Sequence, residues 1–274
     1  AVTLGSSGAG VSLLQGSNPF TVTPPAATTN NVASLTLANL TRSAGAVATF
    51  AATGLGSTVT GNGQIFVTNI NGSAAANANG ILGGWALAGG TAATADNWAT
   101  SVGAQTLSLT TTVNSNSVTL ASGSTANLVV GQSVTGGNLP AGTFITGITS
   151  GTVFTVSAYP TAAGTASSTA AAAGVAALNA AAYTAVSASG TVGSATTSSG
   201  NYSLQLGTAG TITLAAGGNT VNSLQIAPTA AVATTLDLNG SNLVVTSGGV
   251  LRASTNSAAV TIQATGGDRK STRL

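Results

Sequence analysis

Hydrophobic and polar residues alternate in short runs along much of the chain. Aliphatic residues separated by a single position recur at Leu35 and Leu37, Ile65 and Val67, Leu204 and Leu206, Ile212 and Leu214, Leu224 and Ile226, Leu236 and Leu238, and Val260 and Ile262. A period of two places alternate side chains on one face of a β-strand. The pattern therefore predicts many short strands, each with one aliphatic face.

Turn-forming residues separate these runs in the C-terminal third of the chain. They are Gly217-Gly218, Asn239-Gly240, Gly248-Gly249 and Gly266-Gly267. Short strands divided by such turns indicate an all-β fold. A sandwich, a barrel and a solenoid all fit the spacing. The repetition of similar runs favours right-handed β-solenoid, β-helix-like repeats, in which each coil buries its aliphatic row against the next coil.

The stretch 106–173 differs from its surroundings and predicts a compact β module of four or five strands, with a turn at 139–142 from its Pro and Gly residues. We interpret it as an insertion. The predicted organisation is a β-strand repeat region at 1–105, the inserted small β module at 106–173, a second repeat region at 174–267 and a tail at 268–274. Alanines dominate 170–182 and favour helix, so a short helix there is left open.

Charge is almost absent from the natural part of the chain. Charged residues make up 3% of the sequence, and half of them lie in the last seven residues, DRKSTRL. One reading frame of a common sequencing-library adapter encodes this tail, and we interpret it as non-native. Residues 1–267 hold two Arg and two Asp, so their net charge is zero. A nucleic-acid partner is not expected, because no basic patch is available to neutralise phosphates.

The same composition argues against an enzyme. The chain has no His, no Cys and no Glu, whereas general acid–base catalysis needs a His or a tuned pair of carboxylates. No catalytic residue, metal ligand set or cofactor is therefore predicted. Asp237 is the only candidate calcium ligand, and one carboxylate is too few. We expect Asp237 to face outward, on the side opposite Leu236 and Leu238.

Both tryptophans lie between positions 79 and 100. Trp85 and Trp98 have two interpretations: an aromatic plug that covers an edge of the solenoid, or a ligand-stacking platform. Flat apolar rings suit the faces of sugars, so the platform interpretation predicts a glycan ligand.

The runs 222–226, 236–240 and 243–251 follow a strand, strand, Ser-Gly-Gly-hydrophobic order. With 79–85 and 96–99, they resemble the autotransporter-associated β-strand repeat proteins, which are large bacterial outer-surface proteins. The resemblance covers most of the chain outside 106–173. It implies an exported, extracellular β-helical passenger with no catalytic residues. It also implies membrane anchoring only through a C-terminal outer-membrane barrel, which this sequence does not include.

The leading functional hypothesis is a structural or adhesive passenger segment that lies on the bacterial outer surface and binds through self-association or to surface glycans. One alternative is a glycan-binding module, carried by the tryptophans or by the insert. Another is a phage tail-fibre or decoration protein, since the insert is similar to small β modules of bacterial surface and phage proteins.

Overall fold

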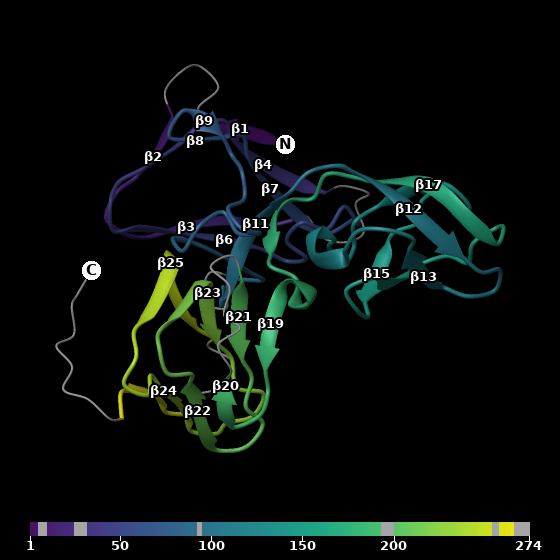
Figure 1. Cartoon of the computed structure of the whole chain (residues 1–274). Helices are drawn as coiled ribbons and strands as arrows, with labels where there is room; N and C mark the ends of the chain where they lie inside the picture. The colour runs from purple at the N-terminus through teal and green to yellow at the C-terminus, as the bar shows by residue number, and fades with distance from the viewer. Residues whose placement is uncertain (5–9, 25–31, 92–94, 193–199, 254–257, 266–274) are drawn as a thin grey trace. The chain divides into compact units, whose positions relative to one another are not determined.

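The computed structural model describes residues 1–4, 10–24, 32–91, 95–192, 200–253 and 258–265. Strands make up 52% of the protein and helices 3%. Parallel strands stack into solenoid coils, which confirms the predicted all-β solenoid with a small inserted β module. The protein forms two compact units, Ala1–Ala182 and Tyr183–Leu274 (Figure 1). The predicted tail at 268–274 lies outside the described residues.

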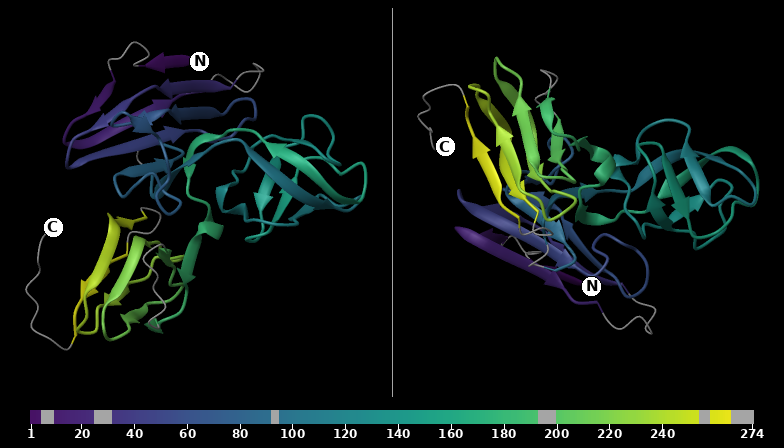
Figure 2. Two further views of the ribbon diagram at one scale, coloured as in Figure 1. Left: turned by 45° about the horizontal axis from the view of Figure 1, so that its top comes forward. Right: turned by 90° about the horizontal axis from the view of Figure 1, so that it is seen from below.

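In the first unit, three sheets form the sides of the coils (Figure 2). The first sheet contains β1 (Val2–Leu4), β4 (Ala33–Leu37) and β7 (Gly63–Val67). The second contains β2 (Val11–Leu13), β5 (Leu40–Arg42), β8 (Asn69–Ile70) and β9 (Ser73–Ala74). The third contains β3 (Gly16–Val22), β6 (Ala46–Ala52), β10 (Ala86–Gly89), β11 (Asn97–Val102) and β18 (Gly174–Ala177).

Parallel register stacks like residues on like in this unit. Leu35 pairs with Ile65 across β4 and β7, and Phe20 pairs with Phe50 across β3 and β6. The two phenyl rings stack with their centroids 5.6 Å apart and their planes inclined by 15°. Ile65 and Phe50 are completely buried in one aliphatic core. The period-two alternation thus places one row of side chains inside the coil, as the sequence predicts.

The inserted module is a six-stranded sheet in the order β14-β17-β12-β13-β16-β15, with every pairing antiparallel. Its strands are β12 (Gln105–Thr111), β13 (Ser117–Leu120), β14 (Val134–Gly136), β15 (Ile145–Ile148), β16 (Val153–Val156) and β17 (Gly164–Ala170), with the 3₁₀ turn η2 (Thr125–Asn127). It has a core of its own around Val118, Ile145 and Phe154. The prediction of four or five strands was too low, because β12 and β17, which pair with each other at the two ends of the module, were not counted as strands.

The coil continues across the module. Ala99–Val102 of β11 pairs antiparallel with Gly174–Ala177 of β18. The Ala-rich stretch is therefore strand at β18, followed by the 3₁₀ turn η3 (Ala180–Ala182), and no α-helix forms there. Gly174 has φ +76°, and a Cβ atom at this position would lie 2.4 Å from the Ile65 carbonyl oxygen. Close packing on β7 overrides the helix propensity of alanine.

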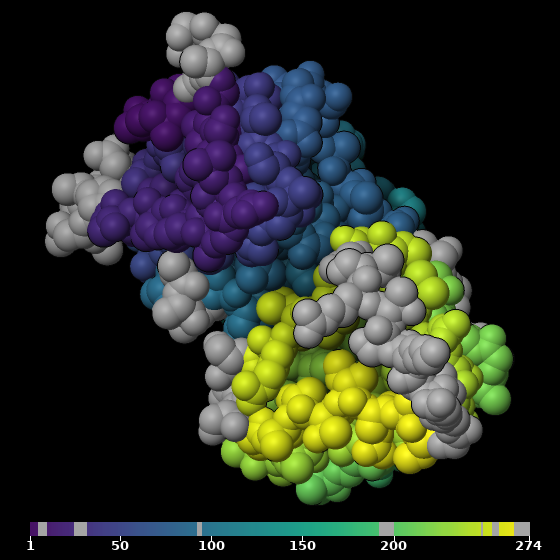
Figure 3. Space-filling model, turned by 90° about the vertical axis from the view of Figure 1, so that its left-hand side faces the viewer, coloured from purple at the N-terminus to yellow at the C-terminus, as the bar shows by residue number. Residues whose placement is uncertain are grey.

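The second unit has two parallel sheets. One contains β19 (Tyr183–Val186), β21 (Asn201–Leu204), β23 (Asn219–Ile226) and β25 (Leu243–Arg252); the other contains β20 (Gly190–Val192), β22 (Gly210–Leu214), β24 (Thr234–Asp237) and β26 (Val260–Gln263). Its core includes Leu224 and Leu236. Their register partners Val250 and Ile262 are half exposed, because β25 and β26 are edge strands. The C-terminal part of the chain, yellow in Figure 3, lies at the surface of the second unit.

Buried polar side chains bind one another between the coils of this unit. Asn201 Oδ1 accepts hydrogen bonds from Asn222 Nδ2 and Ser223 Oγ, both at 2.8 Å. Ser203 Oγ donates to Gln225 Oε1 at 2.9 Å. Each buried polar group needs such a partner, so these bonds help to fix the register of β21 against β23.

Candidate functional site

Asp237, at the end of β24, accepts four hydrogen bonds. Its Oδ1 accepts from the backbone N–H groups of Asn239 and Thr265, each at 2.9 Å. Its Oδ2 accepts from the Thr265 hydroxyl and, at 3.3 Å, from Gln263 Nε2. The donors on Thr265, followed by those on Asn239 and Gln263, hold the pKa of Asp237 well below its usual range, against the opposing effect of burial.

The expectation that Asp237 faces outward needs a correction. The side chain leaves the aliphatic row of Leu236, but it is only 5% exposed. Gln263 and Thr265 of the next coil cover it. A carboxylate has about four lone-pair sites, and four donors already reach this one. Asp237 is therefore an electrostatic link between coils, not a general base.

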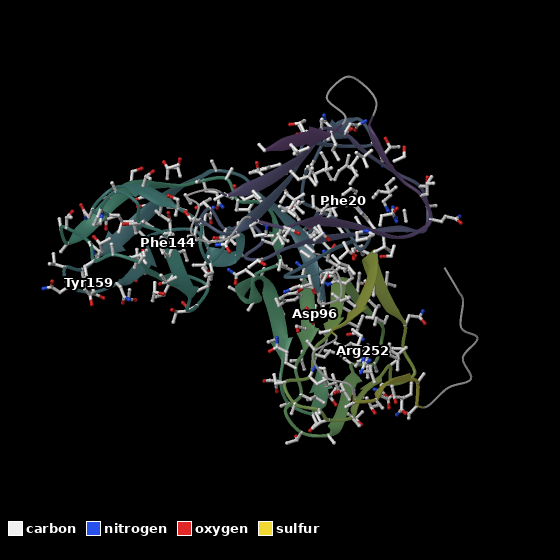
Figure 4. The ribbon with its side chains drawn as sticks, turned by 180° about the vertical axis from the view of Figure 1, so that it is seen from behind. Phe20, Asp96, Phe144, Tyr159 and Arg252 are labelled. Atoms are coloured by element: carbon white, nitrogen blue, oxygen red, sulfur yellow. The ribbon has the colours of Figure 1, made fainter. Side chains whose placement is uncertain are left out.

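The other charged groups of the described residues are scattered. Asp96, labelled in Figure 4, belongs to the first unit and Asp237 to the second. Within the described parts of the chain, no three His, Cys, Asp or Glu side chains could together hold a metal ion. A search of the same residues also finds no helix that is long and apolar enough to cross a membrane.

The structure places the two predicted stacking residues in different surroundings. Trp98 lies in β11, opposite Leu87 of β10, and is only 2% exposed. Its ring therefore has no face to offer a sugar, which rules out the two-tryptophan platform. Trp85 is partly exposed, and the Arg42 guanidinium lies 5.5 Å from its ring centroid. Arg42 Nε donates to the Ala46 carbonyl at 3.0 Å, which holds the cation there.

A groove that the sequence does not predict lies within the first unit, where the module meets the coil. We call it the module groove. It consists of two hollows of about 310 and 290 Å³ that share Val59 and Phe144. The first is lined by Gly54, Ser57, Val59, Asn62, Val130, Gly131, Phe144, Ile145 and Thr146. The second is lined by Thr58, Val59, Thr60, Ser133, Gly142 and Phe144.

Hydrogen bonds join the two sides of the module groove at its base. The Gly131 carbonyl accepts from the Thr58 backbone N–H and hydroxyl, both at 3.0 Å, and from Ser57 Oγ at 3.3 Å. The Thr58 hydroxyl accepts in turn from the Ser133 backbone N–H at 2.8 Å. These bonds hold the module against the turn between β6 and β7.

Phe144 supplies an aromatic surface to this groove. The next residue, Ile145, is completely buried in the module core. Neighbouring residues of an extended chain point to opposite sides, so the Phe144 ring faces out of the module. It is partly exposed, and it is labelled in Figure 4.

The sequence did contain a signal for this site. In a strand, Phe144 and Ile145 must face opposite sides, and an aromatic side chain on the outer side of a small module is often a contact for a ligand or a partner. The opposite wall was not predictable. Ser57 and Asn62 are remote from Phe144 along the chain, and only the docking of the module brings them to the same groove.

Comparisons with family models, with curated proteins and with solved structures found no match to this chain.

Proposed function

We propose that this protein is a structural or adhesive segment of a large secreted bacterial surface protein and that it performs no catalysis. The observation that carries the proposal is the stacking of parallel, nearly uncharged coils around continuous aliphatic rows. Such a body extends by repetition and presents the same polar surface many times. Repeated weak contacts of this kind give strong overall attachment.

Edge strands offer a route to self-association. β1 and β2 are the end strands of their sheets, and neither contains a charged residue or a proline. Val2 and Leu4 of β1 are exposed. By contrast, β3 carries Pro19, which has no N–H group to pair with another strand. Unprotected edges are templates for strand pairing between molecules, and we infer that, in the 274-residue chain taken by itself, β1 and β2 are the preferred contact strands.

Export and a location on the outer surface rest on the resemblance to autotransporter-associated repeats and are part of the proposal. The low charge supports a surface role, because few like charges would repel neighbouring molecules at close approach.

The proposal is tested by measuring the sedimentation of the whole chain over a range of concentrations. We expect the wild type to form larger species as concentration rises. Val2→Lys places a charge on the edge strand β1 and should weaken this association. Val113→Lys is the matched control, since Val113 is also exposed but lies in the turn between β12 and β13.

A wild type that stays monomeric at millimolar concentration would contradict the adhesive form of the proposal. Equal weakening by Val2→Lys and Val113→Lys would instead assign the association to general hydrophobic contact, and would remove β1 as the contact strand.

A further inference from the structure

We propose that the module groove is a binding site for an uncharged saccharide. This inference goes beyond the structural role proposed above and does not depend on self-association. It rests on four properties of the groove: its size, the absence of charge, the combination of one aromatic ring with amide and hydroxyl groups, and a fixed base.

The size of the groove suits a small ligand. Its two hollows, of about 310 and 290 Å³, adjoin at Val59 and Phe144. Ligand sites in proteins usually measure roughly 300–1,000 Å³, so either hollow alone is at the lower limit and the pair is within the range. Two hollows that adjoin in this way fit consecutive units of an oligosaccharide better than one compact molecule.

The lining excludes charged ligands and favours sugars. No Asp, Glu, Lys or Arg lines either hollow, so no counter-charge is available for a phosphate, a carboxylate or an amine. Phe144 offers an apolar ring for the C–H face of a pyranose. Asn62, Thr60 and Thr146 bring amide and hydroxyl groups around that ring. An uncharged molecule with one apolar face and hydroxyl edges matches this lining.

The base of the groove is rigid before any ligand arrives. Ser57 is buried, and its hydroxyl accepts from the Val59 backbone N–H at 3.1 Å and from Asn62 Nδ2 at 3.0 Å, while it donates to Gly131. Gly131 has φ +84°, and a Cβ there would lie 2.0 Å from Ser57 Oγ. The turn and the module are therefore locked together, which lowers the entropic cost of binding.

Asn62 keeps hydrogen-bonding capacity for a ligand. Among the described residues, its side chain makes one bond, the donation from Nδ2 to Ser57. Its Oδ1 atom packs against Gly54, and its second N–H is left to donate to a sugar hydroxyl. Thr146 donates to Thr155 at 2.9 Å and retains lone pairs to accept from a sugar.

The test uses the whole chain, at a concentration where sedimentation shows a monomer. Binding is measured by titration calorimetry against a panel of uncharged oligosaccharides of glucose, galactose, mannose and N-acetylglucosamine. Phe144→Ala removes the ring, and we expect it to weaken binding about tenfold. Tyr159→Ala is the matched control, because Tyr159 is an aromatic residue of the same module, 62% exposed, and outside the groove lining.

Asn62→Ala should also weaken binding, and the unfolding temperature of each variant shows whether the fold is retained. The proposal is supported if at least one sugar of the panel binds the wild type and Tyr159→Ala alike and binds Phe144→Ala less well. It is overturned if no sugar of the panel binds the wild type, or if Phe144→Ala binds as the wild type does. Neither result would alter the self-association measured separately.

Discussion

Asp237 and Thr265 are joined by two hydrogen bonds that connect one coil to the next. The Thr265 backbone N–H donates to Oδ1 at 2.9 Å, and its hydroxyl donates to Oδ2. In a protein with so few charges, an ionised side chain bound between coils has a stabilising role that is independent of the aliphatic core. Thr265 also lies beyond β26, so these bonds extend the contact between the coils past the end of the strand pair.

This arrangement predicts a specific loss of stability in acid. The pKa of Asp237 is lowered in the folded state, whereas an unfolded Asp titrates near about 3.9. Stability from the ionised form is therefore fully present above about pH 4. It falls as the pH drops below that value toward the lowered folded pKa, because only the unfolded chain takes up the proton. Unfolding temperatures of the second unit, measured by circular dichroism, should decline over this window.

Two variants separate Asp237 from the other acids. Asp237→Asn should be less stable at neutral pH, since the amide nitrogen cannot accept from Thr265, and its stability should depend less on pH in the acid range. Thr265→Val removes the hydroxyl donor only. The pKa of Asp237 should then be lowered less in the folded state, so the pH range over which stability declines should become narrower. The same acid dependence in the wild type and Asp237→Asn would show that other carboxyl groups cause the decline.

The buried aliphatic rows predict how much stability is lost when one of their side chains is shortened. Leu37 is completely buried in the core of the first unit. Leu37→Ala should lower the free energy of unfolding by about 2–5 kcal/mol, because it removes apolar contacts and leaves a cavity. Leu14→Ala is the matched control, since Leu14 is 68% exposed, and should change stability by less than about 0.5 kcal/mol. Urea unfolding followed by Trp fluorescence reports on this unit. Equal effects of the two variants would place Leu37 outside the cooperative core.

The aliphatic alternation was sufficient to predict the fold class. Residues such as Leu35 and Ile65 occupy the inner row because a period of two permits one buried face, and repetition permits stacking. Sequence patterning could not show that Trp98 is buried, since an aromatic residue next to polar residues can pack on either side of a strand.

The module groove was not predictable for a different reason. Alternation describes the neighbours of a residue along one strand, and it says nothing about which remote turn docks on that strand. Ser57 and Gly131 meet because a glycine leaves room for the Ser57 side chain. That complementarity is visible only in three dimensions.

Gln132 predicts how strongly the module depends on buried polar contacts. It is 0% exposed. Its Nε2 donates to the Ala171 carbonyl at 2.6 Å, and its Oε1 accepts from the Val129 backbone N–H at 3.0 Å. Gln132→Leu introduces a side chain of similar size but leaves the Ala171 carbonyl and the Val129 N–H unpaired. We therefore expect the free energy of unfolding to fall by roughly 1–3 kcal/mol for each unpaired group.

The matched control is Gln105→Leu. Gln105 donates to the Asn127 carbonyl at 2.6 Å, but this bond is exposed, so water can replace it. Gln105→Leu should change the free energy of unfolding, measured in urea, by no more than about 0.5 kcal/mol. A Gln132→Leu variant as stable as Gln105→Leu would mean that water reaches Val129 and Ala171, and that the module interior is less closed than its burial indicates.

Substitutions of Gly131 can measure how much the contact between module and coil contributes to stability, separately from backbone strain. Gly131 and Gly123 have similar φ angles, +84° and +91°, but a Cβ on Gly123 would meet nothing within 4 Å. Gly123→Ala should therefore cost only the strain of a left-handed backbone, about 1–3 kcal/mol. Gly131→Ala carries the same strain and also collides with Ser57. The loss of stability of Gly131→Ala beyond that of Gly123→Ala, measured by urea unfolding, then reports on the contact between module and coil.

A double variant tests the cause of this excess loss. Combining Gly131→Ala with Ser57→Gly should recover part of it, because the colliding atoms are gone. No recovery would mean that the module separates from the coil once Gly131 is replaced.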